Sequence, residues 1–135
     1  MLWDTKLETG VTRVDNQHRE LCRLVDGLLD RNKETRIEDT IKFLGDYVVQ
    51  HFADEEALQA ACSFPGLPGH KELHADFIKV FLELKTQLAE AEDDGERDMV
   101  ILTINGTVVD WLRNHIMIHD RHFTDYYKAH ANDFT

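Results

Sequence analysis

Two pairs of side chains that can bind metal ions lie on either side of one short break in the chain. The stretch 51–74 reads HFADEEALQAACSFPGLPGHKELH, with His51 and Glu55 before the break and His70 and His74 after it. Each pair has i,i+4 spacing, so on a helix its two side chains lie on the same face. The prolines and glycines of the break end one helix and permit a turn. The stretch therefore predicts two consecutive helices that direct three imidazoles and one carboxylate into a shared space, as metal ligands would be.

Apolar residues recur at helical spacing in four segments that are separated by short breaks. Glycine and proline are scarce, and no long run of strict alternation indicates a strand. Because short connections favour antiparallel neighbours, we expect an all-α, up-down-up-down four-helix bundle that forms one domain over residues 1–135. The expected elements are an N-terminal arm (1–11), a helix from its N-cap Asp15 to about Asn32, helices over Ile37–Ala61, Gly69–Glu92 and Arg97–His119, and a short final helix in the tail (121–135).

Charge and composition narrow the classes of partner. The formal net charge of −11 disfavours nucleic acid and anionic membrane surfaces. The first residues do not resemble a signal peptide, and no apolar run reaches the ~18 residues that a membrane span needs. The two cysteines, Cys22 and Cys62, form no Cys-x2-Cys motif and no dense disulfide pattern. A reduced, cytoplasmic compartment is therefore expected.

Histidines interrupt the apolar stripe of every predicted helix. A single histidine on such a face is more often a packed core residue than a metal ligand. Several imidazoles and a carboxylate buried together without partners would cost several kcal/mol, which is a large part of a typical stability of ~5–15 kcal/mol. Nitrogen-rich, sulfur-free ligation suits zinc, iron, copper or nickel. The ligands are too many for one structural zinc ion, and no glutamate precedes any histidine by three residues, as the Glu-x-x-His di-iron arrangement would need. The histidines concerned are His18, His51, His70, His74 and His115.

Taken in order, these segments resemble a hemerythrin, specifically the bacterial kind. The resemblance covers nearly the whole chain and rests on GVTRVDNQH, HFADEE, the FP break, HKELH and DWLRNHIMIHD. It implies a centre of two iron ions with an oxo or hydroxo bridge. The implied ligands are His70, His74 and His115 on one iron, His18 and His51 on the other, and Glu55 and Asp120 as bridges. One position is then left open on the iron with two histidines, and in the family this is where dioxygen binds.

The fourth predicted helix does not fit this ligand set by spacing alone. Residues five apart on an ideal helix lie ~140° apart around the axis, so His119 would share a face with His115 better than Asp120 does. The family pattern, His-x4-Asp, selects Asp120, and the site needs a second anionic bridge. Either the Asp120 carboxylate reaches in from the flank of the helix, or a π-bulge realigns it with the site.

Residues beside the last histidine ligand are expected to line the oxygen pocket and to keep it dry: Trp111, Leu112 and Ile116. The resemblance implies reversible dioxygen binding for storage, delivery or sensing, rather than an enzyme. The alternative is an oxygen or redox sensor linked covalently to an output domain, such as a diguanylate cyclase or a chemotaxis receptor, from which this chain would be excised. A peroxidase, an oxidase or an enzyme acting on nitric oxide ranks lower, because no candidate acid or base stands out beyond the metal ligands. A purely structural metal site also ranks lower, because structural sites are closed.

Overall fold

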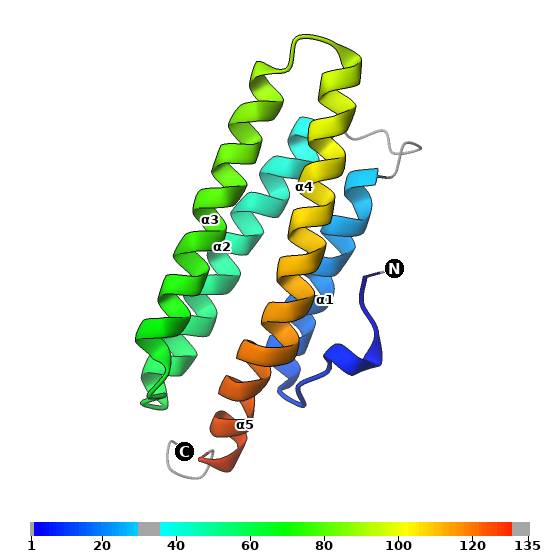
Figure 1. Ribbon diagram of the computed structural model, residues 1–135. Helices are drawn as coiled ribbons and strands as arrows, with labels where there is room; N and C mark the ends of the chain where they lie inside the picture. The colour runs from blue at the N-terminus through cyan, green and yellow to red at the C-terminus, as the bar shows by residue number, and fades with distance from the viewer. Residues whose placement is uncertain (1, 30–35, 131–135) are drawn as a thin grey trace.

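Four long helices form an antiparallel bundle in the computed structural model, which describes residues 2–29 and 36–130. Figure 1 shows that α1 and α3 run in one direction while α2 and α4 run in the other. The predicted four-helix bundle is confirmed, and no strand occurs in these two described ranges. The elements are η1 (Thr5–Leu7), α1 (Thr12–Asp26), η2 (Gly27–Leu29), α2 (Ile37–Ala61), α3 (Leu67–Glu90), α4 (Asp94–Asn114), η3 (His115–Asp120) and α5 (Arg121–Ala129).

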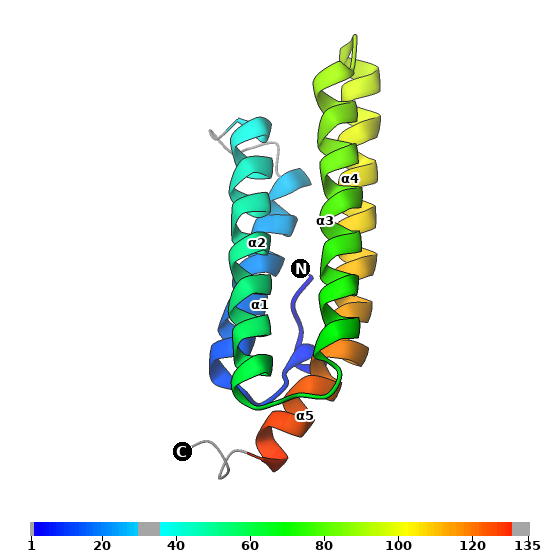
Figure 2. The ribbon, with the colours of Figure 1, turned by 90° about the vertical axis from the view of Figure 1, so that its left-hand side faces the viewer.

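One end of the bundle gathers several connections. The turn between α2 and α3, the short helix α5 and the start of α1 all lie at this end, which we call the α5 end (Figure 2). Here Phe64 and Phe123 pack with Cys62 in a small buried cluster that is separate from the main core. Among the described residues, no helix is both long enough and apolar enough to cross a membrane.

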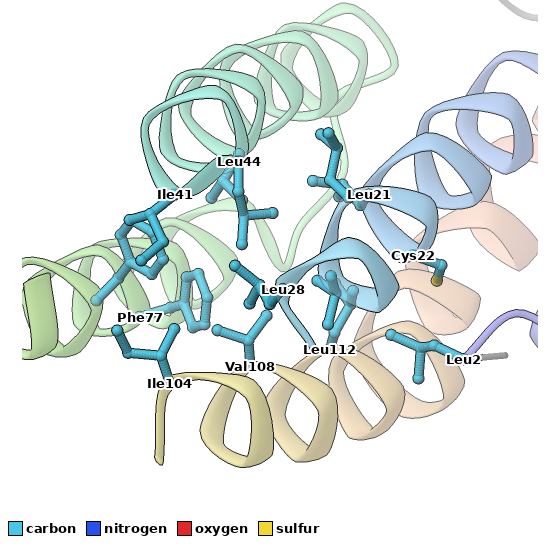
Figure 3. Packing of buried hydrophobic residues seen from close by; sticks show 14 of the residues in the cluster. Leu2, Leu21, Cys22, Leu28, Ile41, Leu44, Phe77, Ile104, Val108 and Leu112 are labelled. Carbon is cyan, nitrogen blue, oxygen red and sulfur yellow. The ribbon is translucent and has the colours of Figure 1, made fainter. Parts of the chain in front are cut away.

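The main core is built from the apolar stripes that the sequence predicts, and all four long helices contribute to it (Figure 3). The N-terminal arm packs on the bundle as well: Leu7 is completely buried and Trp3 is partly buried against the same cluster. Both cysteines are buried free thiols. The predicted stripe positions found buried include Val14, Leu21, Val25, Leu28, Ile41, Leu44, Val48, Phe77, Phe81, Leu84, Leu88, Ile104, Val108 and Leu112.

The first helix differs from the prediction at its start. It begins at Thr12, and Asp15 is not its N-cap. The Asp15 carboxylate instead accepts hydrogen bonds from the backbone N–H of Thr9 (2.8 Å), the Thr9 hydroxyl (2.7 Å) and the N–H of Gly10 (3.1 Å), so it fastens the arm to the helix. Gly10 has φ +88°, a left-handed conformation that glycine adopts at no steric cost. The α-helix α1 ends at Asp26 and is followed by the 3-10 turn η2; the predicted end near Asn32 lies outside the described residues.

The third and fourth helices begin earlier than predicted, for local reasons. Pro68 stands in the first turn of α3, where its missing N–H costs nothing, so it helps to start this helix rather than to delay it. At the start of α4, Asp93 caps the helix by accepting from the N–H of Glu96 (2.8 Å). The predicted end at His119 is wrong, because α4 passes through η3 into α5 without a break.

Candidate metal centre

Seven buried side chains from α1, α2, α3 and η3 converge in the interior near the α5 end. Two groups of possible ligand atoms, each within 4.8 Å of one another, share the carboxylates of Glu55 and Asp120. None of the seven side chains is more than 4% exposed. The first group adds His70, His74 and His115 to the two carboxylates, and the second adds His18 and His51.

Each carboxylate divides its two oxygens between the two groups. Oε1 of Glu55 lies 2.6 Å from Nε2 of His70 and 3.4 Å from Nε2 of His74, whereas Oε2 lies 3.5 Å from Nε2 of His51. Asp120 does the same, with Oδ1 3.1 Å from Nε2 of His70 and Oδ2 3.0 Å from Nε2 of His18. Two carboxylates that each face both groups have the arrangement of bridging ligands between two ions.

The three imidazoles of the first group meet through the same ring nitrogen. Nε2 of His115 lies 3.2 Å from Nε2 of His74 and 3.1 Å from Nε2 of His70. A neutral imidazole carries a proton on only one nitrogen, and three lone pairs that point at one another repel unless a proton or a cation lies between them. The convergence of these three nitrogens therefore suits a positive ion.

Asp120, beyond the end of α4, is turned toward the site by a change of helix type. Residues 115–120 form a π-helix, η3, whose hydrogen bonds join residues five apart instead of four. This places His115 and Asp120, which are five apart, on the same side, and Asp120 is 1% exposed. His119 is exposed to solvent. Of the two alternatives for Asp120, the π-helix is the one present, and it turns Asp120 rather than His119 toward the interior.

The donor set fits a cation on the evidence of its own unsatisfied atoms. In the described part of the chain, both oxygens of Glu55, both oxygens of Asp120 and Nε2 of His18 are buried without a hydrogen-bond partner. Leaving such atoms unpaired in a protein interior is costly. Nitrogen and carboxylate oxygen donors of this kind suit first-row transition metals, iron among them.

The charges of the ligands lead to the same conclusion. Burial lowers the pKa of His18, but the neighbouring carboxylates of Asp120 and Glu55 outweigh it and raise that pKa to about 9. The pKa of His70 is raised to about 9 by the same balance. Burial lowers the pKa of His51 to about 4. Burial opposes ionisation of Asp120, yet His115, His18 and His70 hold its pKa well below the ordinary range. The site therefore binds positive charge, and protons on two imidazoles supply it when no metal does.

Comparison with known proteins identifies the family. The model of the hemerythrin HHE cation binding domain matches residues 9–127. The chain belongs to the hemerythrin family. Bacteriohemerythrins are similar to it over nearly its whole length: that of Stenotrophomonas maltophilia is 29% identical, with 99% of this chain and 86% of the relative covered. Those of Pseudomonas aeruginosa and Clostridium acetobutylicum are 31% and 30% identical, covering 93% and 92% of this chain and 80% and 98% of the relative. The family consists of non-haem iron, oxygen-binding domains, mainly oxygen carriers.

Neighbouring side chains hold two of the candidate ligand histidines by their outer nitrogens. Nδ1 of His74 lies 2.8 Å from Oε2 of Glu56. Nδ1 of His51 lies 2.6 Å from Oε1 of Gln17, whose own amide nitrogen donates to Asp54 (3.0 Å). Partners of this kind fix the tautomer and the orientation of a ligand ring. Sequence reasoning missed them, although Gln17 directly precedes His18 and Glu56 directly follows Glu55.

The three residues expected to line the oxygen pocket lie beside the hemerythrin centre but differ in their surroundings. Leu112 and Ile116 are buried in the main core, and Ile116 is completely enclosed. Trp111 is partly buried, and its ring stacks on His115 with a centroid distance of 4.2 Å and an interplanar angle of 12°. Trp111 therefore fixes the plane of the His115 ring, while Leu112 and Ile116 are part of the apolar core.

Proposed function

We propose that this hemerythrin domain, taken as residues 1–135, holds two iron ions and binds dioxygen reversibly. In this proposal Glu55 and Asp120 are the two protein bridges, and a solvent-derived oxo or hydroxo group is the third. The proposed terminal ligands are His70, His74 and His115 for one iron, and His18 and His51 for the other.

The division of the carboxylate oxygens carries the proposal. A single ion would be surrounded by oxygens that all point at one place, whereas Glu55 and Asp120 each direct one oxygen toward either histidine group. Three histidines on one side against two on the other make the centre unsymmetrical. With two bridging carboxylates and one solvent bridge, the iron with two histidines is one ligand short of six, and the open position is available to dioxygen.

The chain supplies the surroundings that reversible binding needs. Ferrous iron in the centre would supply the electrons that make dioxygen binding favourable. Leu112 and Ile116 present apolar surface with no polar atom, so water and anions that promote irreversible oxidation are kept out.

The test is to reduce the iron-loaded protein without air, add dioxygen and follow the visible spectrum. A charge-transfer band that appears with dioxygen and disappears on its removal, with two irons per chain by metal analysis, is the expected result. Immediate irreversible oxidation would instead favour redox sensing, in which the oxidised state itself is the signal to an attached domain. A purified protein with about one zinc ion and no iron would overturn the proposal.

A further inference from the structure

The two proposed ions do not account for every unsatisfied atom in the interior. Eight buried side-chain atoms in the described part of the chain lack a hydrogen-bond partner. Five of them, the four carboxylate oxygens of Glu55 and Asp120 and Nε2 of His18, face the metal positions. The remaining three are Nδ1 of His18 and the two amide atoms of Gln59. Burying a complete carboxamide without partners is unfavourable, so Gln59 requires an explanation that the ligand set alone does not give.

Gln59 occupies the layer next to the metal ligands. It follows Glu55 by four residues on α2, so both side chains lie on the same inward face, and Gln59 is completely buried. Side chains on a helix lean toward its N-terminus. Since α2 runs toward the α5 end (Figure 1), the Gln59 side chain leans away from that end and back toward Glu55.

The side chain of His18 leans the opposite way along the bundle. Helix α1 starts at the α5 end and runs antiparallel to α2, against which it packs (Figures 1 and 2). Its side chains therefore lean toward the α5 end, that is, toward the level of Gln59. With Nε2 of His18 3.0 Å from Asp120, the outer nitrogen, Nδ1, is left over and fully enclosed.

We infer that Gln59 is a positioning residue for the metal centre: because neither group has a direct partner among the described residues, its amide oxygen is joined to Nδ1–H of His18 through one enclosed water molecule, which donates to the amide and accepts from the imidazole. This inference rests on the proposed di-iron site. The amide nitrogen of Gln59 is then free to donate toward the carboxylate of Glu55, one turn earlier. His51 already has such a partner, because Gln17 accepts from its Nδ1. Both histidines of the two-histidine iron would thus be oriented by a neutral amide.

The experiment replaces the amide without removing its volume, by Gln59→Met. The matched control is Gln87→Met, a glutamine exposed on α3. Two readouts are used: the rate at which each iron is lost to a chelator, and the exchange of the His18 Nδ1 proton in the protein loaded with Zn²⁺, which is diamagnetic and allows nitrogen-15 NMR of the histidines. Gln59→Met is expected to release one of the two irons ~10–100-fold faster, as loss of an outer partner does, and to abolish protection of the His18 Nδ1 proton. Gln87→Met is expected to match the wild type in both.

The outcomes separate this inference from the proposed function. If the wild-type protein holds no pair of metal ions, the di-iron proposal itself fails. If it holds two and Gln59→Met keeps both with unchanged rates and an unchanged His18 proton, the inference alone is overturned. Equal acceleration of both irons would also overturn it, because a general loosening of the fold would then explain the change. Should Gln59→Met not fold, Gln59→Leu takes its place with the same readouts.

Discussion

The two halves of the centre use the same two carboxylates but are held in different ways. In the three-histidine half the ligand rings are wedged between aromatic side chains: Phe52 stacks on His74 at 3.7 Å and 3°, and Trp111 stacks on His115 at 4.2 Å and 12°. The outer nitrogen of His74 also faces a carboxylate, that of Glu56. In this half, the rings of His74 and His115 are therefore held by aromatic stacking, and His74 is also held by a carboxylate.

In the two-histidine half, fewer side chains hold the histidine rings in place. The rings of His18 and His51 meet edge to face at 4.9 Å, and His51 is held by the neutral amide of Gln17 rather than by a carboxylate. His18 has no outer partner among the described residues other than the one inferred above. A carboxylate partner increases the basicity of an imidazole ligand more than an amide does. If the two groups hold iron as proposed, we expect the three-histidine position to bind its ion more firmly and the two-histidine position to exchange a ligand more readily.

Removal of the shared bridge should have the largest effect, because it damages both halves at once. Asp120→Ala deletes the oxygens that face His18 on one side and His70 and His115 on the other. We expect iron content and the oxo-bridge absorption to collapse. His119→Ala, in the same π-helix but with an exposed side chain, should leave both unchanged. The opposite pattern in metal analysis and the visible spectrum would exchange the two assignments.

Protons should compete with metal ions in both halves of the centre, at one histidine in each. His18 in one half and His70 in the other have pKa values raised to about 9, so both are protonated at neutral pH in the metal-free protein. Metal binding must displace these protons. Metal affinity should therefore rise with pH up to about 9, by ~10-fold per pH unit for each half, and then level off. Metal titrations with a pH indicator would measure this, and an affinity independent of pH below 9 would contradict it.

The same pKa shifts determine whether the stability of the metal-free protein rises or falls with pH. A histidine with a raised pKa in the folded state stabilises it fully below its unfolded value of 6.5, and this contribution is lost as pH rises through about 9. His51 acts in the other direction: its pKa is lowered to about 4, so it opposes folding as pH falls below 6.5. Denaturant unfolding of the metal-free protein should be most difficult near pH 6–6.5, and a maximum near pH 9 would rule out this assignment.

Outer partners should have a smaller effect, and they test the difference between the halves directly. Glu56→Gln replaces the carboxylate at His74 by an amide, which makes that contact resemble the one between Gln17 and His51. We expect the three-histidine position to lose ~10–100-fold in metal affinity. Gln17→Leu should cost the two-histidine position ~10-fold or less, because a neutral partner is lost. Equal losses in chelator competition would show that the two halves are supported equally.

What the sequence could predict depended on whether a residue obeys a regular spacing. The i,i+4 pairs of α2 and α3 could be predicted because both helices are regular through the site. Asp120, five residues after His115, could not be predicted from spacing, because a π-helix leaves no periodic signal in the sequence. The family resemblance selected Asp120 where periodicity favoured His119. The bundle and its buried stripes were predictable for the same reason as the pairs.

Residues that act by a single contact escaped prediction. Asp15 is of a residue type that often caps helices, yet its carboxylate accepts hydrogen bonds from Thr9 and Gly10 in the N-terminal arm. This contact depends on the path that the arm takes before α1, which the sequence does not reveal. Gln17 and Gln59 are polar residues on helices, where such residues usually face solvent, and only the packing of α1 on α2 reveals their place. Long-range juxtaposition of this kind has no signature in a single sequence.

The apolar side of the ligands should have the least effect on metal content while changing how the centre behaves. Ile116→Ala removes a completely buried side chain and should lower the free energy of unfolding by ~2–5 kcal/mol. Iron content should stay at the wild-type level, but the space opened admits water, so oxidation in air should be faster. Ile118→Ala, two residues away in the same π-helix and 61% exposed, should change stability by no more than ~0.5 kcal/mol and leave oxidation unaltered. Denaturant unfolding and the decay of the oxygenated spectrum measure the two quantities. If both variants oxidise at the wild-type rate, exclusion of water does not depend on Ile116, and the open position must be shielded by the ligands themselves.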